Sequence, residues 1–231
     1  MSEPAAAPDS RTPASRLKSI SIAGPAGMLE GLLQERDAGV PKFIAVVCHP
    51  DPLQGGTLHN KVVHRVASVL HELGAAVLRF NFRGVGKSEG RSEGGEGELE
   101  DARAALAWLR GRHPGAASWV GGFSFGAWVA ARLAASDPGV AQLILIAPPV
   151  EYRDFSVLRE ARVPKLVIQG TGDQVCAPQS LEREFSLWAE PRRLILVEGA
   201  SHFFDRQLGE LAEALHQALA GPTPRATSSN T

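Results

Sequence analysis

The chain has 231 residues, of which 44% are hydrophobic and 21% are charged, as in a typical soluble globular protein with a substantial core. The formal net charge is −1, from 24 basic and 25 acidic side chains. This balance gives no reason to expect nucleic acid or an acidic membrane surface as a partner.

Both ends of the chain are expected to be disordered tails around one domain. Residues 1–15 are rich in proline, alanine and serine, and residues 221–231 have a similar composition, which leaves a domain over residues 16–220. The N-terminal segment lacks the apolar core of a signal peptide, and no apolar run is long enough to cross a bilayer. Two cysteines, Cys48 and Cys176, are too few for a disulfide scaffold, so we expect a cytoplasmic protein.

The elements predicted in chain order begin with an antiparallel hairpin, in which residues 19–23 and 28–34 flank a turn at 24–27. Beyond it, short runs that are apolar throughout are typical of strands buried on both faces of a parallel sheet. These runs are residues 43–47, 75–80, 119–121, 143–147, 165–168 and 194–197. Apolar residues at helix spacing occur within residues 62–73, 99–109 and 208–219. The alternation predicts an α/β fold, with a mainly parallel central sheet and helices on both faces.

The motif that carries chemistry is Gly122-Phe123-Ser124-Phe125-Gly126, which matches the nucleophile-elbow pattern Gly-x-Ser-x-Gly. In such an elbow the serine lies on a sharp, strained turn between a strand and a helix, and only residues with little or no side chain fit beside it. A strand-like run precedes the motif, and an alanine-rich helical segment, residues 127–135, follows it. We therefore predict that Ser124 is a nucleophile; the alternative is a glycine-rich turn that only packs a helix on a strand.

Partners for Ser124 follow in the order serine, acid, histidine that is known for this motif. Asp173 comes directly after the strand-like run 165–168, and His202 follows the run 194–197. The carboxyl ends of parallel strands meet at one edge of the sheet, so the three side chains are expected to converge there. Histidine can take the serine proton, and the aspartate fixes the imidazole tautomer. Ser124, His202 and Asp173 are the predicted triad.

Other acidic residues offer alternatives for the acid. Glu151 and Asp154 follow the run 143–147 and are the fallback if Asp173 lies too far from His202. Asp205 is close to His202 in sequence, but closeness along the chain does not bring two side chains together.

An oxyanion hole needs two N–H donors. The first is expected from the residue after the nucleophile, Phe125. The second is expected from the loop after the run 43–47, where Pro50 and Pro52 have no N–H. By position Asp51 is the first choice and Leu53 the second. His49, in the same loop, is interpreted as a residue that braces the loop rather than a second base.

Several stretches of the sequence resemble a known family. They are the loop 49–57 (HPDPLQGGT), the segment 60–63 (NKVV), the segment 80–88 (FNFRGVGKS) and the elbow 122–126. With Asp173 and His202 they cover most of residues 43–203, and they make the chain resemble the small, capless α/β-hydrolases related to dienelactone hydrolase and the bacterial predicted serine esterases of that superfamily. The resemblance implies ester hydrolysis without metal or organic cofactor.

This sequence departs from that family at two positions. Dienelactone hydrolase itself uses a cysteine nucleophile, whereas this elbow carries Ser124. Asp51 stands where close relatives are expected to have a second histidine.

Two other functional classes find little support. Residues 84–88 (GVGKS) superficially resemble a phosphate-binding loop, but Asn81 occupies the position of the required glycine and no helix pattern follows. The more plausible role of this segment is a loop braced by Arg83. Metal binding would need ligand spacing, and His59 and His64 are not spaced to share one face of a helix. Cys176 is interpreted as incidental.

The site is expected to be open to solvent. Only residues 148–164 separate two predicted strands at the point where lidded relatives insert a cap, and they leave room for one short helix, roughly 155–161. Aromatic residues could wall an acyl pocket or simply pack in the core: Tyr152, Phe155, Trp188, Phe203 and Phe204. Of these, Tyr152, Phe155 and Phe203 are the predicted substrate-binding residues.

The prediction is a serine hydrolase without metal or cofactor that cleaves small soluble carboxylic esters through an acyl-enzyme; the sequence does not indicate its oligomeric state. The alternatives are a thioesterase or acyltransferase with the same triad, cofactor-free peroxidation on this scaffold, and a non-catalytic binding protein of hydrolase fold.

Overall fold

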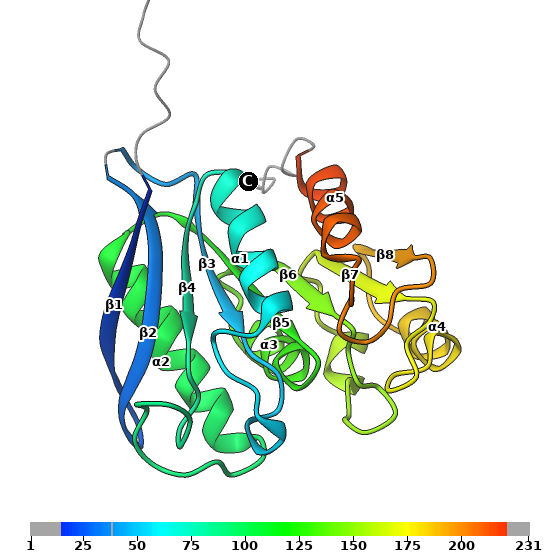
Figure 1. Cartoon of the computed structure of the whole chain (residues 1–231), viewed down its shortest axis with the longest axis horizontal. Coiled ribbons are helices and arrows are strands. Elements are labelled where there is room, and N and C mark those ends of the chain that lie inside the picture. The colour runs from blue at the N-terminus through cyan, green and yellow to red at the C-terminus, as the bar shows by residue number, and fades with distance from the viewer. Residues whose placement is uncertain (1–14, 38, 221–231) are drawn as a thin grey trace, which may run out of the picture.

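The structure is a computed structural model that describes residues 15–37 and 39–220. The tails expected at 1–15 and 221–231 lie outside this range, except for Ser15, which opens the first strand. Within the described ranges the chain forms one sheet of eight strands flanked by helices (Figure 1). The strands are β1 (Ser15–Gly24), β2 (Gly27–Arg36), β3 (Phe43–Cys48), β4 (Ala75–Phe80), β5 (Ala117–Phe123), β6 (Val140–Ile146), β7 (Lys165–Gly170) and β8 (Arg192–Val197).

The strand order across the sheet is β1-β2-β4-β3-β5-β6-β7-β8. β1 and β2 form the predicted antiparallel hairpin, β2 runs antiparallel to β4, and the strands from β4 to β8 are parallel to one another. The chain leaves β3 toward β4 on one side and returns to β5 on the other. This reversal creates a topological switch point outside the carboxyl ends of β3 and β5, where α/β proteins bind their ligands.

Helices cover both faces of the sheet, as the sequence predicts (Figure 1). They are α1 (Lys61–Glu72), α2 (Glu96–Arg112), α3 (Phe125–Ser136), α4 (Pro178–Ser186) and α5 (Leu208–Leu219), with short 3₁₀ helices η1 (Pro52–Gln54) and η2 (Ser156–Arg159). α1 and α5 pack on one face, and α2 and α3 pack on the other. β3 shows why its sequence is apolar throughout: Ile44 and Val46 enter the core under α2 and α3, while Ala45 and Val47 enter the core under α1.

The sequence did not predict α4, because this helix is short and buries few residues, Pro178 and Leu181 among them. Between β6 and β7 the chain forms only turns and η2, which is shorter than the helix expected at 155–161. No cap is inserted there, so the carboxyl edge of the sheet stays open.

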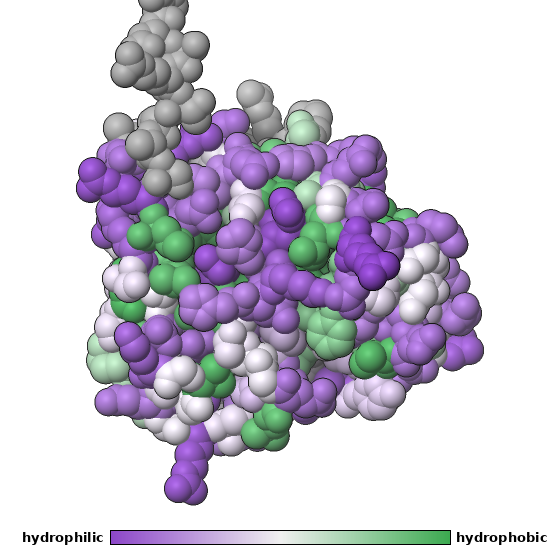
Figure 2. Space-filling view, in the orientation of Figure 1, coloured by the Kyte–Doolittle hydropathy of each residue, from purple (hydrophilic) through white to green (hydrophobic). Residues whose placement is uncertain are grey.

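The face seen in Figure 1 is mostly hydrophilic, with small, separate apolar areas (Figure 2). Scattered apolar side chains of this kind are normal on a globular protein. Among the described residues, no helix combines the length and the apolar character that crossing a membrane would need.

Candidate active site

Ser124 occupies the sharp turn between β5 and α3. Its backbone has φ 54° and ψ −120°, a conformation that L-residues rarely adopt, and the strain is held by the packing around it. A side chain at Gly122 would collide with the Gly126 carbonyl, and one at Gly126 would collide with the carbonyls of Cys48 and His49. The two glycines therefore let the elbow close and let the end of β3 pack directly against the start of α3.

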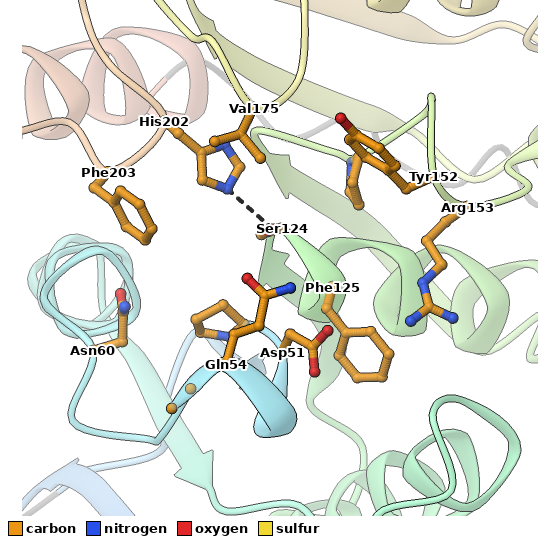
Figure 3. Close-up of a pocket in the computed structure, with 14 residues that line it drawn as sticks. Asp51, Gln54, Asn60, Ser124, Phe125, Tyr152, Arg153, Val175, His202 and Phe203 are labelled. Atoms are coloured by element: carbon orange, nitrogen blue, oxygen red, sulfur yellow. Dashed lines mark hydrogen bonds between the residues drawn. The ribbon is translucent and has the colours of Figure 1, made fainter.

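The three residues predicted as a triad meet in one hydrogen-bonded chain. His202 Nε2 lies 3.1 Å from Ser124 Oγ (Figure 3), and His202 Nδ1 lies 2.8 Å from Asp173 Oδ2. They come from the carboxyl ends of β5, β7 and β8. Asp173 and His202 are both 5% exposed, so the link between them is shielded from water.

Every acceptor position of the Asp173 carboxylate is filled. Oδ1 accepts the N–H groups of Val175 and Cys176, each at 2.8 Å, and Oδ2 accepts His202 Nδ1–H and the Gln169 side-chain amide at 2.9 Å. Burial alone would raise the pKa of Asp173, but the hydrogen bonds from His202 and these backbone groups outweigh it and hold the pKa below its usual value. The carboxylate is therefore ionised and keeps the hydrogen of His202 on Nδ1, which leaves Nε2 free to accept.

Gln169 also holds the Asp173 carboxylate in place, and the sequence alone did not single it out. It is the fifth residue of β7 and is fully buried, and its amide nitrogen bridges Asp173 and the Cys176 carbonyl. A polar residue inside an otherwise apolar strand is the signal that could have found it, because a buried amide needs partners.

The structure separates the two candidates for the second oxyanion donor. The Leu53 N–H donates to Asp51 Oδ1 at 2.9 Å, and Leu53 is 77% exposed, so it does not face the cleft. Asp51 lines the cleft with Ser124 and Phe125 (Figure 3), and no acceptor in 15–37 or 39–220 takes its N–H. The Phe125 N–H is at the first position of α3, where the helix itself offers no partner. Leu53 is thus the wrong alternative, and its N–H is used locally instead.

His49 braces the loop after β3, as interpreted from sequence. It is fully buried; its Nδ1–H donates to the Pro50 carbonyl at 2.7 Å, and its Nε2 accepts the Phe82 N–H at 3.1 Å. Burial lowers the pKa of His49 to about 4, despite the opposite effect of the hydrogen bond to Pro50. The His49 ring is buried and both of its nitrogens are already hydrogen-bonded, so it is not placed to act as a base.

The segment 84–88 continues as turns rather than as a helix, unlike a phosphate-binding loop. Arg83 anchors it through a two-pronged ion pair with Asp101 of α2, with Arg83 Nη2 2.8 Å from Asp101 Oδ1 and Nε 3.0 Å from Oδ2, and through Glu93 at 2.8 Å. Asp101 is completely buried. Arg83 therefore fixes the loop after β4 onto α2.

The cleft around Ser124 measures about 580 Å³. His202 and Phe203 stand on one side of it, and Asp51 and Gln54 stand on the other (Figure 3). Tyr152 lines it as well and is largely exposed.

Phe155, by contrast, was wrongly predicted to face the substrate. It is 1% exposed and stacks on Trp188 with 5.8 Å between ring centroids, so it belongs to the hydrophobic core. Trp188 and Phe204 are core residues too.

The fallback acids are engaged elsewhere. Glu151 accepts the Ser180 hydroxyl at 2.6 Å, Asp154 accepts the N–H and the hydroxyl of Ser156, and Asp205 pairs with Lys61. None of them is bonded to His202 within the described residues.

One group of side chains has the composition of a metal site: Asp173, Cys176 and His202, whose ligand atoms lie within 4.8 Å of one another. It overlaps the triad, and the Asp173 oxygens already accept hydrogen bonds at all their usual positions. Burial raises the pKa of Cys176 to about 12, so its thiol is protonated and is a poor ligand. A metal ion would have to dismantle the Asp173–His202 link to bind there.

A serine elbow at the switch point of a mostly parallel sheet defines the α/β-hydrolase class of fold. Comparison with known proteins agrees. The family model described as serine aminopeptidase, S33, matches residues 41–159, just over half of the chain. An uncharacterised protein of Rickettsia prowazekii is 36% identical in an alignment of 210 residues that covers 87% of each chain.

Two solved structures are similar over nearly the whole length. A serine hydrolase without lid from Xanthomonas campestris is 39% identical with a TM-score of 0.83, over 91% of this chain and 96% of its own. A serine hydrolase homologue from Coxiella burnetii is 41% identical with a TM-score of 0.84, over 87% of this chain and 97% of its own. The chain therefore belongs to the α/β-hydrolase superfamily. It has the fold of the serine hydrolases among these similar structures.

Proposed function

We propose that this protein hydrolyses small carboxylic esters through an acyl-enzyme formed on Ser124. The observation that carries the proposal is the continuous link from Ser124 Oγ through the His202 imidazole to the Asp173 carboxylate, at 3.1 and 2.8 Å. These distances lie within the reach that proton transfer between a nucleophile, its base and the orienting acid requires.

In the proposed reaction Ser124 Oγ attacks the ester carbonyl while His202 Nε2 takes its proton. The ionised Asp173 stabilises the imidazolium that forms. The Phe125 and Asp51 N–H groups donate to the oxyanion of the tetrahedral intermediate, where one donor contributes roughly 3 kcal/mol of transition-state stabilisation. His202 then gives its proton to the departing alcohol, the ester C–O bond breaks, and a water molecule activated by the same histidine releases the acid from Ser124.

The open cleft supports esters of modest size. Within residues 15–37 and 39–220 no cap covers Ser124, and Tyr152 and Phe203 offer aromatic surfaces to an acyl or alkoxy group (Figure 3). A site open to water favours hydrolysis over transfer to another acceptor, because water competes for the acyl-enzyme.

The test is activity against p-nitrophenyl esters of increasing acyl length, together with matched thioesters and acyl acceptors. We expect hydrolysis of short-chain esters that Ser124→Ala abolishes, and covalent labelling of the wild-type protein by a fluorophosphonate probe. Equal turnover by wild type and Ser124→Ala would refute the proposal. Selective thioester cleavage or acyl transfer would keep the triad and change the substrate class.

A further inference from the structure

One peptide group joins the buried His49 to the cleft. The carbonyl of Pro50 and the N–H of Asp51 belong to the same peptide, and in a trans peptide these two groups point in opposite directions. His49 Nδ1–H holds that carbonyl at 2.7 Å on the buried side. The Asp51 N–H must then face the other way, toward the cleft that Asp51 lines with Ser124. We propose that His49 is a positioning residue that aims the Asp51 N–H at the oxyanion; this rests on the proposed function.

The His49 ring has a single orientation and a single tautomer. The Pro50 carbonyl can only accept, so Nδ1 carries the hydrogen, and the Phe82 N–H can only donate, so Nε2 carries none. The ring also packs on Phe82, with 4.6 Å between centroids, and Phe82 packs edge-on against Phe125 beside the nucleophile. A ring held on both nitrogens and on its face cannot turn without breaking these contacts.

The part of the loop that follows this peptide is held by hydrogen bonds of its own. The Asp51 carbonyl accepts the N–H groups of Gln54 and Gly56 at 3.1 and 2.9 Å, and the Asp51 side chain caps η1. The Pro50 ring fixes its own φ. The orientation of the Pro50–Asp51 peptide then depends on the Pro50 ψ and the Asp51 φ, and the hydrogen bond from His49 is what holds those two angles.

The hydrogen bond is independent of ordinary pH changes. With its pKa lowered by burial to about 4, His49 is neutral at neutral pH and keeps both bonds. Protonation would place a hydrogen on Nε2 against the Phe82 N–H. The bracing role therefore requires the neutral ring that burial provides.

The experiment compares three variants of the full chain. His49→Phe keeps an aromatic ring against Phe82 and removes the donor to Pro50. His49→Asn keeps an N–H at nearly the Nδ1 position. His71→Phe is the matched control, because His71 is also buried and its Nδ1 also bonds a backbone carbonyl, that of Ala75 at 3.0 Å, but it lies at the opposite edge of the sheet.

Hydrolysis of p-nitrophenyl acetate is measured per folded site, with sites counted by the final extent of fluorophosphonate labelling. His49→Phe is expected to lower kcat by about 10- to 100-fold with KM nearly unchanged, somewhat less than the loss of a whole oxyanion donor. A trifluoromethyl ketone, whose adduct with Ser124 carries an oxyanion, should bind more weakly by the same factor. His49→Asn should recover most of kcat, and His71→Phe should leave kcat unchanged.

An unchanged kcat per site in His49→Phe, or an equal loss of kcat in His71→Phe, would overturn the inference and leave the proposed function standing. A loss that falls on KM alone, or unaltered ketone binding, would overturn it too. If His49→Phe does not fold, His49→Asn and the ketone decide: near-wild-type kcat and ketone affinity support the inference, and a loss as deep as that of a missing donor opposes it. A wild-type protein that reacts with neither ester nor fluorophosphonate would overturn both proposals.

Discussion

Replacing Asp173 by asparagine keeps nearly the same side-chain shape but is expected to lower kcat strongly. Oδ1 of Asp173 accepts two backbone N–H groups, from Val175 and Cys176. In Asp173→Asn the amide oxygen must take this position, because an NH₂ group set against these two fixed backbone donors would cost about 1–3 kcal/mol for each donor. The donors at Oδ2, from His202 and Gln169, belong to side chains that can change tautomer or flip instead. The amide NH₂ is thereby directed at His202 Nδ1.

An NH₂ group in that position reverses the hydrogen bond to His202. The imidazole can accept it only if its hydrogen moves to Nε2, the nitrogen that lies 3.1 Å from Ser124 Oγ. A ring with Nε2–H cannot take the serine proton, and a substitution of this kind lowers kcat about ten-thousandfold. That corresponds to about 5 kcal/mol of lost transition-state stabilisation. KM should change little, because Asp173 does not line the cleft.

The assay is kcat and KM for p-nitrophenyl acetate, with the fold checked by the urea unfolding midpoint. Glu151→Gln and Asp154→Asn are the matched controls, since each neutralises an acidic residue that follows β6 and is engaged away from His202. Both should keep wild-type kcat. If folded Asp173→Asn retained more than about a tenth of wild-type kcat, or if a control lost as much, Asp173 would not be the orienting acid.

Phe155→Ala should lower the free energy of unfolding by about 3–5 kcal/mol and leave kcat per folded site unchanged, because the ring is buried in the core. Phe203→Ala should change stability little and raise KM for aryl or longer acyl esters. Urea unfolding and ester kinetics on both variants test this, and a higher KM in Phe155→Ala or a large loss of stability in Phe203→Ala would contradict it. Asp101→Asn leaves the Arg83 guanidinium without its buried partner and should lower the free energy of unfolding by about 3–5 kcal/mol, so an unchanged urea midpoint would contradict the anchoring role. The hydrogen bond from Arg112 outweighs burial and lowers the pKa of Glu35 from 4.5 to about 2, so its contribution to stability is present above pH 4.5 and is lost as the pH falls through 2. The stability difference between wild type and Glu35→Gln should therefore shrink between pH 4.5 and pH 2, and urea titrations that find it constant down to pH 2 would contradict this.

The fold was predictable because its signals are strong and local. A buried parallel strand must be apolar on both faces; β3 is apolar along its whole length, and β4 and β7 are apolar over most of theirs. The elbow has no room for side chains at Gly122 and Gly126, so both positions must be glycine, and this pattern is visible in the sequence. Ser124, Asp173 and His202 each follow such a strand, and parallel strands bring their carboxyl ends together.

Features that depend on a particular partner were not predictable. Phe155 and Phe203 both lie near the site in sequence, and only packing decides that one fills the core while the other faces the cleft. Leu53 was a reasonable candidate for the second oxyanion donor from its position in the sequence. Its N–H instead donates to the Asp51 side chain, a local hydrogen bond that competes with any distant acceptor. Gln169 was missed because its partners, the Asp173 carboxylate and the Cys176 carbonyl, lie in the loop after β7, and the sequence does not show that this loop turns back over the strand.

The central claim is a covalent acyl group on Ser124 during turnover. Rapid acid quenching of the protein mixed with excess p-nitrophenyl ester, followed by mass spectrometry of its peptides, tests this directly. We expect one acyl group, on the peptide that contains Ser124, formed at the rate of the initial p-nitrophenol burst. An acyl group found instead on Cys176 or on another side chain, in a protein whose Ser124→Ala variant turns over the ester equally fast, would contradict it.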